Sequence, residues 1–192
     1  MLLLREGHRC ESLRARTPQV AHVEGLQREA RVKAQRQPIL GITGHRPSKL
    51  GGYGENTLRI KVRDAMRREF ERLNPLRVLS GMALGVDQWA VELAISMHIP
   101  FHAFIPFAGQ ESKWPLDQQR YYHQLLKAAE RTIYVSNEGY AAWKMQRRNE
   151  AVVNLCDHLL AVFDGGSGGT ANCVSYAERK GRPITLIDPG TL

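Results

Sequence analysis

The sequence predicts an α/β fold with a doubly wound, mostly parallel β-sheet and a basic N-terminal arm. From Ile39 onward, short apolar runs alternate with segments whose apolar residues recur at helical spacing. The runs are continuously apolar, which is typical of strands buried on both faces of a parallel sheet. Several of them lead directly into glycine-rich loops. Strand, loop and helix therefore repeat along most of the chain.

Residues 1–36 form the predicted arm. They carry eight Lys and Arg against four acidic residues, so half of the net charge of +8 lies in them. They contain no aromatic residue, and Gly25 interrupts a weak helical pattern from about residue 20 to 35. We expect a mobile or partner-dependent extension in front of a folded domain that spans residues 37–192. A basic tail attracts polyanions without specificity, so charge alone does not indicate a nucleic-acid-binding protein.

Six strands and five helices are predicted in the folded domain. Asn56 or Thr57 can cap the first helix, Asn74-Pro75 ends it, and Gly181 suits the end of the last helix. The predicted strands are Ile39–Gly44, Leu76–Leu79, Phe101–Pro106, Arg131–Val135, Leu159–Phe163 and Arg182–Ile187, and the helices lie at about 57–73, 86–97, 116–129, 144–156 and 170–180.

The loops after these strands are the expected place for a ligand, because open parallel sheets bind ligands beyond the carboxyl ends of their strands, where strand order reverses. With the common order 3-2-1-4-5-6, the loops after strands 1 and 4 would flank that crevice. The unusual loops span residues 44–47, 80–87, 136–143 and 164–170.

The loop at 164–170 has the strongest pattern. It holds four glycines around Ser167, between an apolar strand and a helix that restarts at Thr170. Backbone N–H groups and the positive end of a helix then face an anion, which predicts a phosphate cradle at Gly168, Gly169 and Thr170. The alternative is a plain flexible loop. Asp164 can bond a ribose hydroxyl or only its own turn.

The other loops carry charged groups and aromatic rings. Arg46, beside Gly44 and His45, is a candidate phosphate contact because its guanidinium is a planar fork of donors. Asp87 can contact the ligand or only stabilise the start of its helix. One of Arg147 and Arg148 is expected to be a solvated charge. One of the loop aromatics can stack on a base or pack onto the core: Tyr53, Trp114, Tyr140 and Trp143.

These same residues resemble known motifs. Ser80–Asp87 resembles the SG-x-A-x-G-[IV]-D motif of the DprA family, and Met145, Arg148 and Gly168-Gly169-Thr170 resemble the signature of LOG-type phosphoribohydrolases. Over about residues 39–189 the chain is similar to the YpsA-like branch of the DprA/LOG-like (SLOG) superfamily. This resemblance implies a modified Rossmann fold, a nucleotide-derived ligand and a homo-oligomer. The implied ligand-binding residues are Gly44, His45, Arg46, Ser80, Gly81, Asp87, Arg148, Asn149, Asp164, Gly168, Gly169 and Thr170.

The resemblance to the hydrolases is incomplete. Their signature uses an arginine and a glutamate for catalysis; Arg148 matches the arginine, but Cys173 stands where the glutamate is expected. Cleavage of an N-glycosidic bond needs an acid or base near the ribose. Asp87 or Glu138 would have to take that role.

The sequence therefore predicts a protein that binds a small nucleotide or nucleotide-derived ligand, such as ADP-ribose or a nucleoside monophosphate, as a sensor or regulator. The alternatives are a nucleotide N-glycosidase using Arg148 and Asp87, and a DprA-like single-strand DNA-binding module. A nucleic acid partner is not favoured, because residues 37–192 carry a net charge of only +4. Three cysteines without CxxC spacing indicate a cytoplasmic protein without a zinc site, no apolar run is long enough to span a membrane, and no metal or cofactor is expected.

Overall fold

The computed structural model describes residues 37–137 and 139–192. Two predictions lie outside these residues: the mobile or partner-dependent arm at 1–36, and Glu138 as a substitute acid. All of the other predicted site residues are described.

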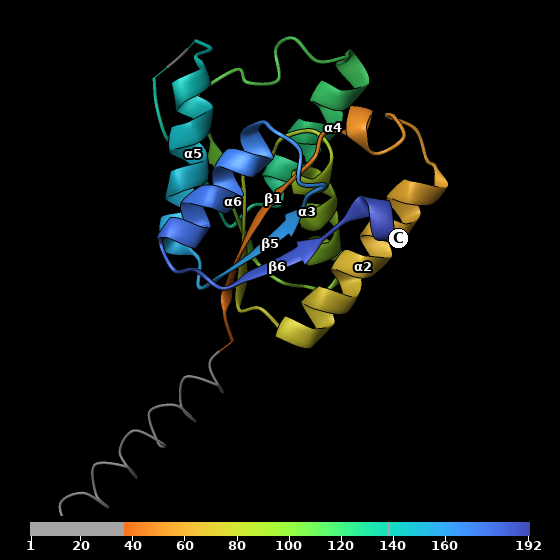
Figure 1. The fold of residues 1–192 in the computed structure, drawn as a ribbon. Coiled ribbons are helices and arrows are strands. Elements are labelled where there is room, and N and C mark those ends of the chain that lie inside the picture. Colours follow the sequence, from red (N-terminus) through yellow and green to blue (C-terminus); the bar gives the residue numbers. More distant parts are fainter. Residues whose placement is uncertain (1–36, 138) are drawn as a thin grey trace, which may run out of the picture. The chain divides into compact units, whose positions relative to one another are not determined.

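The described residues form a six-stranded, all-parallel sheet with the order β4-β3-β2-β1-β5-β6 (Figure 1). The strands are β1 (Ile39–Gly44), β2 (Arg77–Ser80), β3 (Phe101–Ile105), β4 (Arg131–Tyr134), β5 (His158–Val162) and β6 (Ile184–Ile187). The order 3-2-1-4-5-6 is therefore wrong. The fourth strand extends the sheet beside β3, and only after it does the chain cross over to place β5 beside β1.

This order moves the crevice to the loops after β1 and β5. Gly44 at the end of β1 pairs with Val162 at the end of β5, so the two strands finish side by side. The glycine loop after β5 consequently lies next to the Gly44–Pro47 turn.

Helices cover both faces of the sheet. On one face, α2 (Thr57–Leu73), α3 (Val86–Ser96) and α4 (Leu116–Lys127) enclose the larger apolar core, which includes Phe70, Trp89 and Tyr122. On the other face, α5 (Ala142–Leu155) and α6 (Gly169–Arg179) enclose a smaller core that includes Val153, Cys156 and Cys173 (Figure 1). Two short 3₁₀ helices, η1 (Pro47–Lys49) and η2 (Pro189–Thr191), complete the described elements.

The helix ends follow from local chemistry. The side chain of Asn56 accepts a hydrogen bond from the Arg59 N–H and caps α2, and Asn74 ends that helix in a left-handed conformation. Gly181 has a φ of 62° just after α6, as predicted for a glycine that stops a helix. The predicted elements are all present, and their ends agree with the prediction or differ from it by one or two residues.

Candidate functional site

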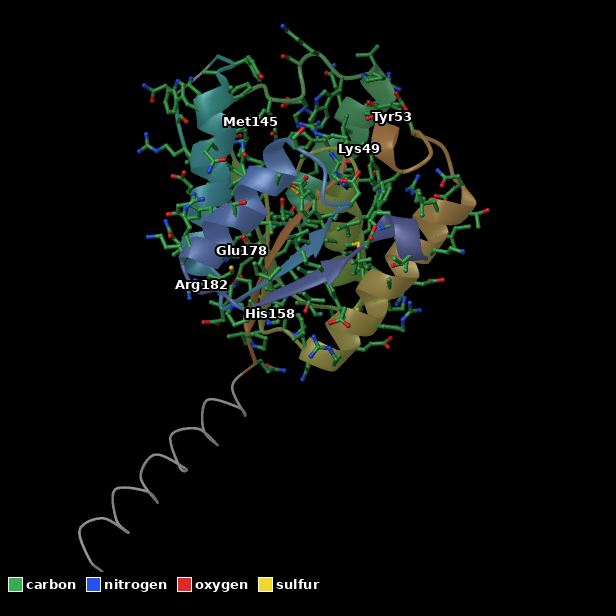
Figure 2. The ribbon with its side chains drawn as sticks, viewed as in Figure 1. Lys49, Tyr53, Met145, His158, Glu178 and Arg182 are labelled. Carbon is green, nitrogen blue, oxygen red and sulfur yellow. The ribbon has the colours of Figure 1, made fainter. Side chains whose placement is uncertain are left out.

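A cavity of about 340 Å³ opens at the carboxyl ends of β1 and β5. Figure 2 shows Lys49 and Met145, which line it, at the opposite end of the domain from His158 and Arg182. The cavity is therefore located where strand order reverses, as the rule for open parallel sheets requires. Its lining residues are Thr43, Gly44, His45, Arg46, Ser48, Lys49, Ala83, Asp87, Met145, Arg148, Asn149, Ser167, Gly168, Gly169 and Thr170.

One wall of the cavity is the start of α6. Gly168 precedes the helix with a φ of 134°, a conformation that favours glycine, and no side chain of the described residues caps this end. The first backbone N–H groups of α6 are therefore available to an anion. Asn149 holds this end in place, because its Nδ2 donates to the Gly169 carbonyl at 3.3 Å.

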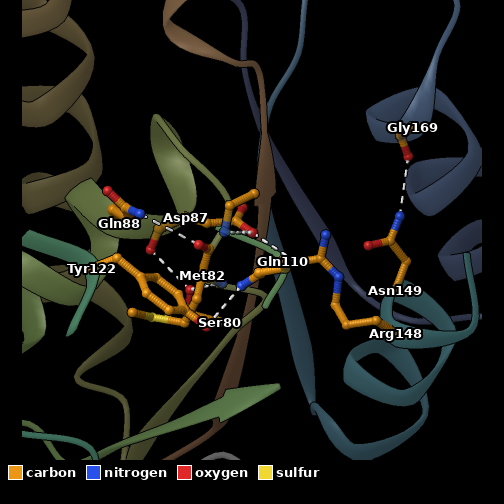
Figure 3. A network of polar contacts seen from close by, with 10 residues as sticks. Ser80, Met82, Asp87, Gln88, Gln110, Tyr122, Arg148, Asn149 and Gly169 are labelled. Carbon is orange, nitrogen blue, oxygen red and sulfur yellow. Dashed lines mark hydrogen bonds and ion pairs between the residues drawn. The ribbon is translucent and has the colours of Figure 1, made fainter. Parts of the chain in front are cut away.

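The floor of the cavity contains a buried ion pair. Arg148 Nη1 donates to Asp87 Oδ2 at 2.9 Å, and the two side chains are 9% and 6% exposed (Figure 3). The Arg148 Nε is buried without a hydrogen-bond partner among the described residues. A buried, incompletely satisfied guanidinium is costly unless a further acceptor reaches it.

Gly81 makes room for this guanidinium. A Cβ added to Gly81 would lie 1.0 Å from Arg148 Nη1 and 2.1 Å from Arg148 Cζ. The residue after β2 can therefore only be glycine while Arg148 keeps its position. Gly81 of the DprA-like motif and Arg148 of the LOG-like motif are thus in direct contact.

The turn after β2 is held by its own polar groups. Ser80 Oγ donates to the Asp87 carbonyl at 2.9 Å and accepts from the Met82 N–H at 3.1 Å. The Ala83 N–H donates to Asp87 Oδ2 at 3.2 Å, and Gln88 Nε2 lies 3.4 Å from the Met82 carbonyl (Figure 3). These bonds fix the carboxylate of Asp87 under the cavity.

The loops after β1 and β5 are joined by His45 and Asp164. His45 Nε2 lies 2.8 Å from Asp164 Oδ1, and it also lies 3.0 Å from the Asp164 backbone nitrogen. A nitrogen cannot donate to the carboxylate and accept from the backbone N–H at once. The 2.8 Å approach to a carboxylate oxygen requires a proton on Nε2, so we assign this nitrogen as the donor.

The carboxylate of Asp164 has further partners. The Gly166 N–H donates to Oδ1 at 2.8 Å, and Lys49 Nζ lies 3.4 Å from Oδ2. The Gly166 bond and then the His45 contact hold the pKa of Asp164 at about 2, well below its usual range. Asp164 thus bonds its own turn and the neighbouring loop, and it does not line the cavity.

Close packing brings α3 against the His45 turn. Gly85 has a φ of 94°, and a Cβ on it would lie 2.6 Å from the His45 carbonyl oxygen. A Cβ on Gly44 would lie 2.6 Å from Val86 Cβ. Gly85 thus lets the backbone of α3 approach the His45 carbonyl, and Gly44 makes room for the side chain of Val86.

The structure brings nine of the predicted residues together around the cavity: Gly44, His45, Arg46, Asp87, Arg148, Asn149, Gly168, Gly169 and Thr170. Ser80, Gly81 and Asp164 instead support the residues that line it. The sequence reasoning did not single out Thr43, Ser48, Lys49, Ala83, Met145 and Ser167 as site residues, although all of them lie in or beside the glycine loops and motifs. Arg147 is exposed, as expected for one of the two neighbouring arginines.

Cys173 does not lie in the cavity wall. It is 1% exposed and packs with Val153, Cys156 and Leu159 in the core under α6. Burial raises the pKa of its thiol to about 11, so this cysteine is an inert core residue. In the described part of the chain, no three His, Cys, Asp or Glu side chains are grouped as a metal site would require. No helix there has the length and apolar character needed to cross a membrane.

A match to a protein family shows to which family the chain belongs. The profile of the YpsA family, described as the YspA SLOG family, matches residues 40–192. The chain belongs to the YspA SLOG family. Among YspA relatives, protein YoqJ from the SPbeta prophage of Bacillus subtilis is 32% identical over 145 residues, which are 65% of this chain and 85% of YoqJ. A UPF0398 protein of Bacillus thuringiensis is 26% identical over 153 residues, 74% of this chain and 83% of that protein.

Solved structures share the fold of this YspA-family chain. DNA processing protein A (DprA) from Streptococcus pneumoniae aligns with a TM-score of 0.59 and 19% identity, over 79% of this chain and 50% of DprA. The molybdenum cofactor carrier protein of Chlamydomonas reinhardtii aligns with a TM-score of 0.51 and 18% identity, over 79% of this chain and 76% of that one. At these identities the similarity establishes the DprA-like, Rossmann-type architecture, and this chain spans half the length of DprA.

Proposed function

We propose that this protein binds a nucleotide or nucleotide-derived ligand, with a phosphate against Gly168, Gly169 and Thr170, and that it acts as a sensor or regulator. The observation that carries the proposal is the uncapped N-terminus of α6, which opens into a cavity between the ends of β1 and β5. Oriented N–H groups and the helix dipole favour an anion there.

The charges around the cavity support the same assignment. Arg46, Lys49 and Arg148 line it, while Asp87 is the only carboxylate that the described residues contribute to the wall and is already paired with Arg148. Arg46 is exposed and its guanidinium is available to a second phosphate oxygen. The volume of about 340 Å³ is within the usual range for a small ligand.

The second candidate function is hydrolysis of the N-glycosidic bond, since Asp87 and Arg148 lie together on the cavity floor. It is the weaker candidate. Asp87 Oδ2 already accepts from Arg148 and from the Ala83 N–H, so this oxygen is not available to carry a proton to the substrate. Release of adenine from AMP that Arg148→Ala abolishes would establish the hydrolase.

The cellular setting is also a proposal. We infer a cytoplasmic homo-oligomer, without a resident cofactor or metal. Support comes from Cys156 and Cys173, which are both buried free thiols. A single-stranded nucleic acid is the less favoured partner, because the cavity is the size of a single small ligand and not a continuous groove.

The test is a valine at Gly169. A Cβ there would meet no protein atom within 4 Å, and the residue has no left-handed φ, so the valine side chain would extend into open space at the cavity wall while the protein stays folded. This side chain would keep the phosphate away from the backbone N–H groups. Loss of one charge-assisted hydrogen bond to them costs about 1.5–3 kcal/mol, which is roughly a ten- to hundredfold loss of affinity. Thr170→Ala keeps its backbone N–H and should weaken binding less.

Calorimetric titration with AMP and ADP-ribose measures this effect. The matched control is Gly54→Val, because a Cβ at Gly54 also meets no atom within 4 Å and Gly54 lies outside the cavity. We expect Gly169→Val to abolish binding and Gly54→Val to leave it unchanged. Equal affinities of folded Gly169→Val and wild type would refute the phosphate cradle.

A further inference from the structure

A second cavity of about 510 Å³ adjoins the first. The two share Arg46 and Met145 in their walls, so they are direct neighbours. The loop after β3 supplies most of the second wall, and Gly139 and Tyr140 complete it together with the two shared residues. The complete lining is Arg46, Phe107, Ala108, Gly109, Gln110, Ser112, Lys113, Trp114, Gly139, Tyr140 and Met145.

The wall of this second cavity differs from the first in being aromatic. Phe107, Trp114 and Tyr140 all line it, whereas among the described residues His45 alone contributes a ring to the first cavity. Trp114 packs edge-to-face on Tyr122 at 5.4 Å, and Tyr140 meets Phe107 edge-on at 6.1 Å. Tyr140 is nevertheless 70% exposed. An exposed aromatic ring in a concave wall offers a face on which another planar ring can stack.

The segment that carries Tyr140 is held by Lys144. The Nζ of Lys144 donates to the Asn137 carbonyl at 2.9 Å and to the Gly139 carbonyl at 2.8 Å. These bonds fix the backbone beside Tyr140. Because Lys144 belongs to α5, this helix as well as the loop holds the segment that carries the Tyr140 ring.

Gln110 supplies a polar group with fixed orientation. Its side chain is buried, and its Nε2 donates to the Tyr122 hydroxyl at 3.1 Å (Figure 3). Its Oε1 has no hydrogen bond from the described residues, so it is an acceptor for an N–H of a ligand. Apolar walls with a few oriented polar groups are typical of small-molecule sites.

We propose that the second cavity holds the base of the ligand, stacked on Tyr140 and Trp114, while its phosphate lies against the glycine loop of the first cavity. Arg46, common to both walls, contacts the ligand between the two groups. This inference rests on the proposed function, because it places the far end of the same ligand. It assigns specificity for the base to the loops after β3 and β4.

The experiment compares AMP with ribose 5-phosphate, which has the same phosphate and ribose without the base. Both are titrated calorimetrically into the full chain, into Tyr140→Ala and into Tyr140→Phe. Stacking predicts that wild type binds AMP about five- to a hundredfold more tightly than ribose 5-phosphate, and that Tyr140→Ala removes most of this preference. Tyr140→Phe keeps the ring and should keep the preference.

The control variants separate this inference from the proposed function. Tyr53 is 56% exposed and lines neither cavity, so Tyr53→Ala should change nothing. Gly169→Val should abolish the binding of both ligands, whereas Tyr140→Ala should weaken the binding of AMP alone. Equal affinity of AMP for Tyr140→Ala and wild type would overturn the base site and leave the phosphate cradle intact. Absence of AMP binding to wild type would overturn both.

Discussion

Replacing Gly81 by alanine tests whether the ion pair under the cavity depends on the glycine after β2. The added Cβ would lie 1.0 Å from Arg148 Nη1 and 2.1 Å from Cζ, so the guanidinium must leave its position. Gly81 has no left-handed φ, so backbone strain does not contribute. What is lost is the 2.9 Å bond from Arg148 to Asp87.

The expected cost follows from burial. Asp87 is 6% exposed at its side chain, so moving Arg148 leaves a buried carboxylate whose remaining partner is the Ala83 N–H. Removing one partner of a buried ion pair costs about 3–5 kcal/mol. For a domain of this size, each kcal/mol lowers the melting temperature by about 2–4 °C. Gly81→Ala should therefore melt roughly 6–20 °C below wild type.

Denaturant unfolding of Gly81→Ala, Asp87→Asn and the double variant measures the coupling directly. With a neutral side chain at position 87, moving the guanidinium no longer leaves a buried charge unpaired. The cost of Gly81→Ala should then fall by more than half. Gly54→Ala is the matched control, since its Cβ would meet open space. Costs that add to within about 0.5 kcal/mol would refute this explanation of Gly81.

Two further predictions concern stability. The pKa of Asp164 is lowered to about 2, so its carboxylate contributes stability above its unfolded pKa of about 3.9 and loses it as the pH falls towards 2. The difference in unfolding free energy between wild type and Asp164→Asn should therefore shrink between pH 4 and 2; a difference that persists unchanged at pH 2 would contradict the assignment. A chain beginning at Gln37 should melt within a few degrees of the full chain, because the apolar pattern begins at Ile39; a large loss of stability by calorimetry would show that residues 1–36 contribute to folding.

Local patterns predicted the elements well, and non-local pairing explains what they missed. Apolar runs and caps are properties of short segments, so the strand at Ile39–Gly44 and the cap at Asn56 could be found from the sequence. Strand order depends on which edge of the sheet accepts β4. Arg131–Tyr134 has a polar, mostly exposed sequence that suits an edge strand, but it does not say which edge, and the common order was the wrong prediction.

The glycines indicated where the cavity lies, but not the contacts that each residue around it makes. Gly168 and Gly169 follow a buried strand, which is a local signal for an anion site. Ser80 and Gly81 gave the same kind of signal, yet one bonds the turn and the other makes room for Arg148. A sequence motif indicates which residues gather around a site. It does not indicate which of them line the cavity and which support the lining residues. The second cavity was harder to predict from the sequence, because its only signal was a set of isolated aromatic residues in loops.

The position of Cys173 bears on binding versus hydrolysis. A catalytic carboxylate has to reach the cavity, but position 173 points into the core beside Cys156 and Leu159. A glutamate there would be buried among apolar side chains at a cost of several kcal/mol. The segment around Gly168 still supplies free N–H groups, and Arg148 remains beside Asp87. The residues that match the glycine and arginine parts of the hydrolase signature are thus present without its acid, and this combination supports the proposal of nucleotide binding over that of hydrolysis.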